Sequence, residues 1–353
     1  MTANKGALTF REIAEQPQAM KAAYEEALKR KDWAEAYLKG PADRQTLFVG
    51  SGSSYYQAMT MAATYRSWLG RPAIAWPASE LLFLRGQTAI DCMDTVVIGV
   101  SRSGESSEAV KALESVKPLP GWRCAGVTCY ADSSMAKLGD SLISRLGAES
   151  SMVMTKSLSS MIIGIQTAIA SVSDQAERRL DELISVVAGQ PERISSAREL
   201  AQELVSVRHF DRTVFLGMGA MFGMAQEGCM KLKEMSNAWT ESFGTLEFRH
   251  GPKSIVDSHT CVVVLVSEQS RAEELKVARE MQEYGAHVVV VAAAEGADAS
   301  FADTFVETGL PEVSDEARAT AALPFLQYYG FYTALKRGND PDHPRNLAKV
   351  VIL

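Results

Sequence analysis

Two short segments of the sequence combine serine and glycine directly after an apolar run, a pattern that could bind an anion. The segment "GSGSS" follows the apolar residues "TLFV", and the segment "SRSGES" follows "TVVIGV". Glycine lets the backbone approach a ligand closely, and serine adds neutral hydrogen-bond donors. The residues expected to contact the anion are Gly52, Ser53, Ser54, Ser101, Arg102, Ser103 and Ser106.

A phosphate is a better fit to these segments than a whole nucleotide. Each segment precedes a predicted helix, whose N-terminal N–H groups and dipole favour an anion. The lysine of a P-loop and the third glycine of a dinucleotide fingerprint are both missing. The alternative is that the serines only cap helices, but capping needs one serine per helix and explains fewer than five.

A second group of residues could move protons. In the helical pattern "AQEGCMKLKEMS", Glu227, Lys231 and Glu234 are spaced i, i+4 and i+7, which places them on one helix face. A solvent-exposed stripe of ion pairs has the same spacing and remains an alternative. His250 lies in the segment "EFRHGPKS", predicted to be a loop, and a neutral imidazole beside Arg249 suits proton transfer near pH 7.

The elements that would position these residues are apolar strands alternating with helices. Strands are predicted at residues 45–50, 71–78, 95–100 and 122–130, and such runs are typical of a parallel sheet covered on both faces. We expect an α/β fold of two tandem doubly wound sheets flanked by helices. The predicted organisation is an N-terminal helical segment 1–30, a phosphate-binding domain 31–170, a helical connection 171–207 and a second domain 208–353.

The two predicted domains look like an internal duplication. The segment "TVFLGMGAMFGMAQEG" echoes "TLFVGSGSSYYQAMTM", and "CVVVLVSEQS" echoes "TVVIGVSRSG". The serine-rich loops occur only in the first half. Since a requirement of the fold should appear in both halves, these loops indicate a ligand site that one half has kept.

Composition excludes several other classes of protein. The net charge of −7 argues against a nucleic-acid-binding surface. We find no signal peptide, no apolar run long enough to span a membrane, and no cluster with metal-ligand spacing. The sequence therefore predicts a cytoplasmic enzyme without a metal or cofactor. No C-x-x-C pair occurs, and the expected buried thiols are Cys92, Cys124, Cys129, Cys229 and Cys261.

Five motifs together resemble the sugar isomerase (SIS) family. They are "GSGSSYYQA", "SRSGESSEA", "KLKEMS", "FRHGPKSIVD" and "HPRNLAKVVIL". The whole set is most similar to the isomerase half of glucosamine-6-phosphate synthases. The fourth motif also resembles the tagatose-6-phosphate ketose/aldose isomerase branch, and the last resembles the SIS-type aminosugar-phosphate deaminases.

The resemblance implies a role for each candidate residue. The serines of both loops would hold a sugar 6-phosphate, and Glu234 would move a proton between C1 and C2. Lys231 would neighbour the enolate oxygen, and Lys349 would reach the sugar near its carbonyl. His250 would open the sugar ring in the site of the partner subunit, which implies a homodimer. The implied function is a phosphosugar isomerase or an aminosugar-6-phosphate deaminase-isomerase.

Departures from the synthase pattern leave the exact reaction open. The sequence begins at the isomerase half, so we expect no glutaminase activity. Arg102 stands where the synthases have glutamine, and it would add a cation to the loop of residues 101–106 (the anion loop). The added charge also leaves open a substrate with a 6-sulfonate in place of the 6-phosphate. A plain ketose/aldose isomerase, a fructosamine-6-phosphate deglycase and a non-catalytic sugar-phosphate sensor are also compatible with the motifs.

Overall fold

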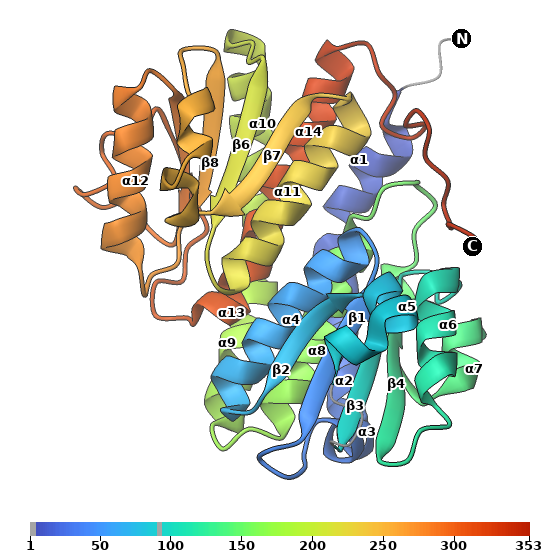
Figure 1. Ribbon diagram of the computed structural model, residues 1–353. Coiled ribbons are helices and arrows are strands. Elements are labelled where there is room, and N and C mark those ends of the chain that lie inside the picture. Colours follow the sequence, from blue (N-terminus) through green and yellow to red (C-terminus); the bar gives the residue numbers. More distant parts are fainter. Residues whose placement is uncertain (1–4, 90–93) are drawn as a thin grey trace. The chain divides into compact units, whose positions relative to one another are not determined.

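A computed structural model of the chain describes residues 5–89 and 94–353 and contains two compact units, each built on one five-stranded parallel sheet (Figure 1). The β1–β5 unit comprises Glu15–Ser150, Met154–Ala188 and Ala348–Leu353. The β6–β10 unit comprises Gly189–Leu347, Ser151–Val153 and the N-terminal residues up to Ala14. The predicted α/β class with two tandem domains is confirmed.

The β1–β5 unit alternates strands and helices through most of its length. Its strands are β1 (Gln45–Gly50), β2 (Ala73–Pro77), β3 (Thr95–Val100), β4 (Trp122–Thr128) and β5 (Ser141–Ile143). Its helices are α2 (Gln16–Lys29), α3 (Lys31–Tyr37), α4 (Ser53–Leu69), α5 (Ala78–Thr88), α6 (Ser107–Val116), α7 (Ser134–Leu138), the 3₁₀ helix η1 (Arg145–Gly147), α8 (Lys156–Ser171) and α9 (Ala176–Ala188).

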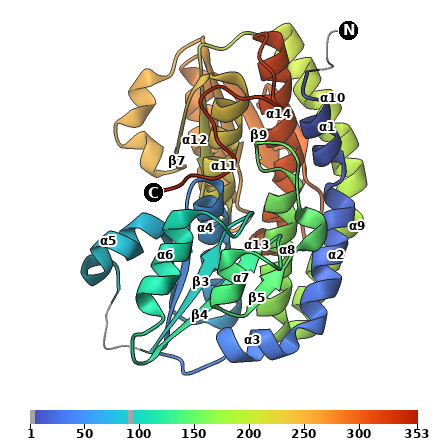
Figure 2. The same ribbon diagram turned by 90° about the vertical axis from the view of Figure 1, so that its right-hand side faces the viewer.

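Helices cover both faces of this sheet, which explains why its central strands are almost wholly apolar. On one face, Leu47, Val49 and Val97 pack against α5 and α6. On the other face α4 packs against β1 and α8, and α2 lies along α8 (Figure 2). The side chains of α8 from Ser157 to Ala170 are all buried, so α8 is a core helix of this unit.

The β6–β10 unit has the same construction. Its strands are β6 (Arg212–Gly217), β7 (Trp239–Gly244), β8 (Thr260–Leu265), β9 (His287–Ala292) and β10 (Thr304–Glu307). Its helices are α1 (Ala7–Ala14), α10 (Gln190–Val207), α11 (Ala220–Ser236), η2 (Glu247–Arg249), η3 (Pro252–Ile255), α12 (Arg271–Glu283), α13 (Asp315–Arg318), η4 (Ala319–Ala322) and α14 (Leu323–Lys336).

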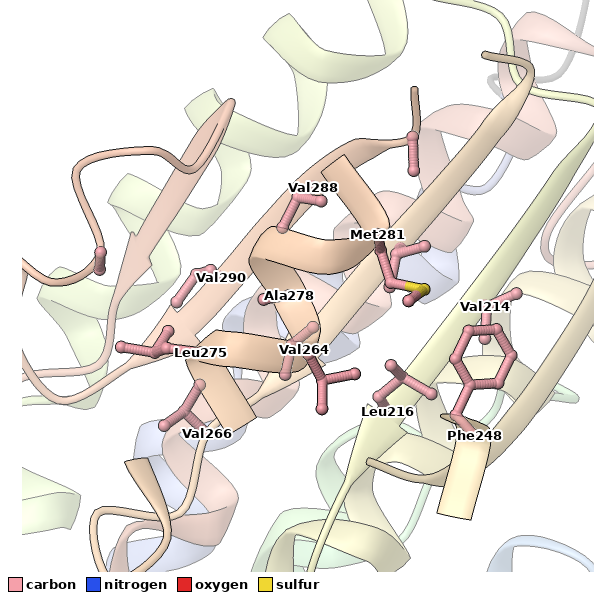
Figure 3. Packing of buried hydrophobic residues seen from close by; sticks show 14 of the residues in the cluster. Val214, Leu216, Phe248, Val264, Val266, Leu275, Ala278, Met281, Val288 and Val290 are labelled. Carbon is pink, nitrogen blue, oxygen red and sulfur yellow. The ribbon is translucent and has the colours of Figure 1, made fainter. Parts of the chain in front are cut away.

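Helix α12 covers one face of the second sheet. Its residues Leu275, Ala278 and Met281 pack on the buried valines of β8 and β9, and Phe248 of η2 belongs to the same cluster (Figure 3). Helices α10, α11 and α14 pack together as a second layer, with α11 against β6 and β7. Burial of Phe248 therefore fixes the segment that carries His250 to the core of this unit.

The strand orders confirm the duplication. The first sheet runs β2-β1-β3-β4-β5 and the second β10-β9-β8-β6-β7, which is the same order read from the other edge. This order is one of the common doubly wound arrangements. The strands β5, β7 and β10 were not predicted, and β7 ends shortly before the segment that carries His250. The three missed strands are short or largely polar edge strands.

The stretch predicted to connect the halves, residues 171–207, is divided between the units. Helix α9 belongs to the β1–β5 unit and α10 to the β6–β10 unit. The predicted domain boundaries themselves stay a prediction. None of the described helices is long and apolar enough to cross a membrane. Cys92 lies outside the described residues, and the other four cysteines are free thiols.

Candidate functional site

The acid–base residues on α11 form a buried ion cluster. The Lys231 Nζ atom lies 3.2 Å from Oε1 of Glu227 and also forms an ion pair with Oε2 of Glu234. The side chains of Glu227 and Lys231 are 0% and 1% exposed, whereas Glu234 is 18% exposed. Glu234 is therefore the member of the cluster that a ligand could reach.

Burial decides between the two interpretations of this helix face. The solvent-exposed stripe of ion pairs is excluded, because a lysine with 1% exposure is not solvated. Burial alone would lower the pKa of Lys231, but the negative charges of Glu227 and Glu234 outweigh it and hold the pKa above its usual value. Lys231 is thus a fixed positive charge in a region of low dielectric constant, where it acts strongly on neighbouring charge.

The two serine loops lie at the carboxyl ends of adjacent parallel strands. Strand β1 pairs with both β2 and β3, so the loops after β1 and β3 flank the point at which the strand order reverses. Open α/β sheets bind ligands at such a point. A hydrogen bond of 2.5 Å from Oγ of Ser51 to Oε2 of Glu108 joins the first loop to the start of α6.

The loop serines do not cap the helices that follow. The N-cap residues of α4 and α6 are Gly52 and Ser106, and neither forms a side-chain capping bond. Instead, the Ser101 hydroxyl donates to Oγ of Ser106 at 3.2 Å, and Oγ of Ser103 accepts from the Glu105 N–H at 3.1 Å. Helix capping therefore does not explain why serines are concentrated in the second loop.

The backbone conformation of the loop after β1 recurs in the second half of the chain, whereas its serines do not. Gly52 has φ 57° and ψ −130°, and its counterpart Gly219 after β6 has φ 56° and ψ −127°. This positive φ favours glycine in both halves. The residues that follow are Ser53 and Ser54 in one half but Ala220 and Met221 in the other. The hydroxyl groups are thus specific to the β1–β5 unit.

Glu149 is a buried residue of this unit that the sequence patterns did not reveal. It accepts hydrogen bonds from the backbone and hydroxyl groups of Thr155 and Ser157, at 2.6–3.0 Å, and thereby caps α8. Its Oε2 also lies 3.3 Å from Nη1 of Arg102, and its carbonyl accepts a 2.9 Å bond from Nζ of Lys349. Part of the Arg102 charge, expected to serve the anion loop, is therefore compensated inside the protein.

Two predicted site residues, Arg102 and Lys349, are thus brought together on Glu149. They also line a common pocket with Ser103, beside the anion loop. The pair Lys231 and Glu234 belongs to the other unit, as does His250, which forms no ion pair with Glu234 among the described residues. Nowhere in residues 5–89 and 94–353 do three or more His, Cys, Asp or Glu side chains gather as a metal site would require.

His250 is exposed on a loop, and residues on both sides of it in the sequence, Arg249 and Lys253, bind α12. Its imidazole forms no hydrogen bond or ion pair within the described residues. Glu280 of α12 forms ion pairs with Nε of Arg249 at 2.9 Å and with Nζ of Lys253 at 2.6 Å. The hydroxyl of Tyr284 donates to the same carboxylate at 2.8 Å. The loop therefore presents an unpartnered imidazole on an anchored backbone.

Removing the Glu280 charge is expected to loosen this loop. In Glu280→Gln, amide hydrogen exchange over residues 247–256 should become about three- to tenfold faster, since partly exposed ion pairs contribute roughly 1 kcal/mol. Hydrogen bonding from Lys253 lowers the pKa of Glu280. In the wild type the stabilisation of the loop by the Glu280 ion pairs is therefore complete above about pH 4.5 and is lost as the pH falls further. The control is Glu283→Gln, an exposed acid on the same helix, and equal exchange in both variants would contradict the prediction.

Comparison with known proteins identifies the family. Residues 42–171 and 206–306 match the SIS domain, and together these segments exceed half of the chain. The chain belongs to the SIS domain family. The first SIS segment contains both serine loops and Glu149, and the second contains Lys231, Glu234 and His250. Lys349 lies beyond both segments.

Relatives of this SIS protein include synthases, isomerases and deaminases. It is 29% identical over 320 residues to a glutamine–fructose-6-phosphate aminotransferase (isomerizing) of Pseudomonas aeruginosa, and this match covers 87% of the chain but 51% of the relative. The chain thus spans about half the length of that curated relative. Its fold matches a tagatose-6-phosphate ketose/aldose isomerase of Escherichia coli with a TM-score of 0.87 and 22% identity, covering 97% of each chain.

A third SIS relative is a deaminase of known structure. The glucosamine-6-phosphate deaminase of Thermotoga maritima has a TM-score of 0.73 and 27% identity, covering 94% of this chain and 100% of that one. These comparisons assign the chain to a family of phosphosugar isomerases and related enzymes.

Proposed function

We propose that this SIS protein is an aminosugar-6-phosphate deaminase-isomerase, which moves a proton between C1 and C2 of an open-chain 6-phospho sugar. The observation that carries the proposal is the cluster on α11, in which Lys231 is buried between two carboxylates and only Glu234 is partly exposed. In this proposal Glu234 is the base, and the family of the relatives supplies the substrate class.

The geometry of the cluster suits proton transfer through an enol intermediate, which is an enolamine for an aminosugar and an enediol for a plain sugar. Removal of a proton beside a carbonyl places negative charge on oxygen, and a preorganised cation lowers the energy of that state. Lys231 supplies the cation, and Glu234, three residues later on the same face, supplies the carboxylate. Glu227 also pairs with the ammonium group, at 3.2 Å, so Lys231 keeps one ion pair when Glu234 changes protonation state.

The anion loop would bind the 6-phosphate. Ser101 and Ser103 follow the central strand β3, and Gly104, with φ 66°, turns the backbone where a Cβ atom would lie 2.2 Å from Oγ of Ser133. Neutral donors at this position suit an anion that must bind and leave in each turnover. Lys349 and Arg102, joined through Glu149, lie beside the same loop and would contact the sugar or its phosphate.

Plain aldose–ketose isomerisation is the second candidate. The same pair of Lys231 and Glu234 performs that reaction, because transfer of a proton between C1 and C2 requires no amino group on the sugar. The two candidates therefore differ in one step: with an aminosugar the proton transfer leaves an imine at C2, which water hydrolyses to the ketose with release of ammonia.

A panel of substrates separates these candidates. Purified protein should be assayed with 6-phosphates of glucosamine, galactosamine, fructose and tagatose, and both ketose formation and ammonia release should be measured. Ammonia release from an aminosugar 6-phosphate is the expected result. Interconversion without ammonia would support the plain isomerase, and no turnover of any 6-phospho sugar would contradict both. Fructosamine 6-phosphates and a 6-sulfonate sugar extend the panel to deglycase and sulfonate-sugar isomerase activities.

Substitution of the loop serines tests the anion site. The double variant Ser101→Ala/Ser103→Ala should fold normally but have a KM raised by at least about a hundredfold, since each of the two hydrogen bonds to a charged group contributes about 1.5–3 kcal/mol. The control is Ser115→Ala, which removes a hydroxyl from α6 that bonds the Ala112 carbonyl, away from the loop. If the double variant keeps the KM of the wild type, the loop does not bind the phosphate.

We further propose that His250 serves the site of a second copy of the chain. The imidazole is exposed and unpartnered in its own described chain, while the backbone that carries it is anchored by Phe248 and Glu280. A rigid loop that directs a free imidazole outward is suited to completing a neighbouring site. This would make the homodimer the active form.

A further inference from the structure

The loop after β8 is a structural copy of the anion loop after β3. The sequence "CVVVLVSEQS" aligns with "TVVIGVSRSG", which pairs Ser267 with Ser101 and Ser270 with Gly104. Both loops close with the same turn. The Gly104 N–H donates to the Ser101 carbonyl at 3.2 Å, and the Ser270 N–H donates to the Ser267 carbonyl at 3.1 Å. The second half therefore retains the backbone form of an anion-binding loop.

In this copy, the donors of the loop bind a carboxylate of the same chain. The Ser267 hydroxyl donates to Asp315 at 2.5 Å, and the Glu268 N–H donates to Asp315 at 3.0 Å. The Gln269 N–H reaches the same carboxylate at 3.5 Å, and the Arg318 guanidinium forms an ion pair with it. The side chain of Asp315 is 10% exposed and that of Arg318 is 1% exposed. A hydroxyl, two backbone N–H groups and an arginine around one anion are what a bound phosphate would also receive.

A second internal carboxylate takes the remaining donors. Glu274 accepts from the Ser267 N–H at 3.0 Å and from the Ser270 hydroxyl at 2.7 Å. Both hydroxyl groups of this loop are thus used within the protein. In the part of the chain that the structure describes, the loop of the second half has no serine free to bind an external anion.

The anion loop of the first half differs from this loop in its hydrogen-bond partners and in the charge at its second position. Within the described residues, no carboxylate accepts a hydrogen bond from Ser101 or Ser103, and the Ser101 hydroxyl donates to Ser106 instead. The charge at the second loop position is also reversed, since Arg102 in the first loop corresponds to Glu268 in the second. The hydroxyl groups of Ser101 and Ser103 are therefore not taken by an internal carboxylate, whereas those of Ser267 and Ser270 are taken by Asp315 and Glu274.

We propose that Asp315 is a built-in occupant of a second anion site, and that it restricts each chain to one sugar-phosphate site. This inference rests on the proposed function in one respect, namely that the loop after β3 binds phosphate. In the wild type the carboxylate of Asp315 takes the place of the ligand. Removing it should expose a site for a phosphate-sized oxyanion, formed by Ser267, two backbone N–H groups and Arg318.

Binding of inorganic phosphate to Asp315→Ala tests the proposal. Equilibrium dialysis should find one more phosphate per chain in Asp315→Ala than in the wild type. The added site should be weaker than the first, because Glu268 and Glu274 remain beside it. The control is Glu312→Ala, which removes an exposed negative charge three residues earlier and should bind as the wild type does. Equal stoichiometry in the two variants overturns the proposal.

The same experiment separates this inference from the proposed function. Adding Ser101→Ala/Ser103→Ala to Asp315→Ala should remove the first phosphate and leave the second. If the wild type binds no phosphate at all, the proposed anion site fails, but a single phosphate gained in Asp315→Ala still supports the role of Asp315.

A second variant guards against misfolding, since Asp315→Ala leaves the buried Arg318 with only its 3.8 Å ion pair to Glu268. Asp315→Ser removes the carboxylate and empties the space that it fills, but keeps a short polar side chain at this position. Its unfolding temperature should rise by several degrees more in inorganic phosphate than in sodium chloride of equal ionic strength, and by more than that of the wild type, because a ligand that binds only the native state stabilises it. Glu312→Ser should show the same difference as the wild type. If neither Asp315→Ala nor Asp315→Ser shows a larger shift than the wild type, the proposal is overturned.

Discussion

Replacing Glu234 with glutamine is expected to lower kcat by about 10²–10⁴ and to leave substrate affinity nearly unchanged, because a positioned general base contributes to the chemical step. Glutamine has the shape of glutamate but accepts no proton at neutral pH. Lys231 keeps its ion pair with Glu227 at 3.2 Å in this variant, so its buried charge stays compensated and the helix should fold as before.

Isotope exchange makes this prediction specific to the proton-transfer step. The wild-type enzyme should exchange the C1 or C2 hydrogen of its substrate with deuterium from solvent, and Glu234→Gln should not. The control is Glu203→Gln, an exposed acid on α10 of the same unit, which should exchange as the wild type does. Exchange at the wild-type rate in Glu234→Gln would show that another group is the base.

The central strands could be predicted from the sequence because burial on both faces leaves a direct signal. Strands β1, β3 and β8 are continuous apolar runs whose residues beyond the first are all buried. The edge strands β5, β7 and β10 give no such signal. In β7, "WTESFG", one residue is buried, and pairing with β6 over its whole length makes it a strand. Pairing partners distant in sequence, and not local pattern, decide these elements.

The spacing of Glu227, Lys231 and Glu234 could also be predicted, but their burial could not. A solvated helix has the same i, i+4, i+7 pattern. Helix α14 packs closely on the part of α11 that carries the cluster, and a Cβ atom at Gly330 would lie 3.0 Å from the carbonyl oxygen of Lys231. That contact joins residues far apart in the chain, so no local window of the sequence contains it.

The same limit explains why Glu149 and Asp315 were missed. Each is a carboxylate that meets an anion loop from a distant part of the chain, Glu149 through Arg102 and Asp315 through Ser267. The comparison of the two halves did predict that the serine loops were a ligand site and not a fold requirement. It could not show that the second loop is filled by an internal carboxylate, since the two residues are separated by 48 positions.

Mixing two inactive variants is expected to restore activity if His250 completes the site of its partner. His250→Ala and Glu234→Ala should each be nearly inactive as homodimers, because every site then lacks one of the two groups. In a heterodimer, one site has its own Glu234 and the partner's intact His250, while the other site lacks both. Since half of the dimers in an equal mixture are heterodimers, activity should return to about a quarter of the wild-type value.

The control for subunit exchange is a mixture of the wild type with the double variant His250→Ala/Glu234→Ala. Its heterodimers have two sites that each lack one group and are therefore inactive. Only the wild-type homodimers, about a quarter of all dimers, stay active, so the activity should be about a quarter of that of a fully wild-type sample. If each site were instead built within one chain, the double variant would leave the wild-type sites untouched and activity at about half. Recovery in the first mixture and loss in the second must therefore occur together, because both follow from the single proposal that the exposed imidazole of His250 acts across a subunit boundary.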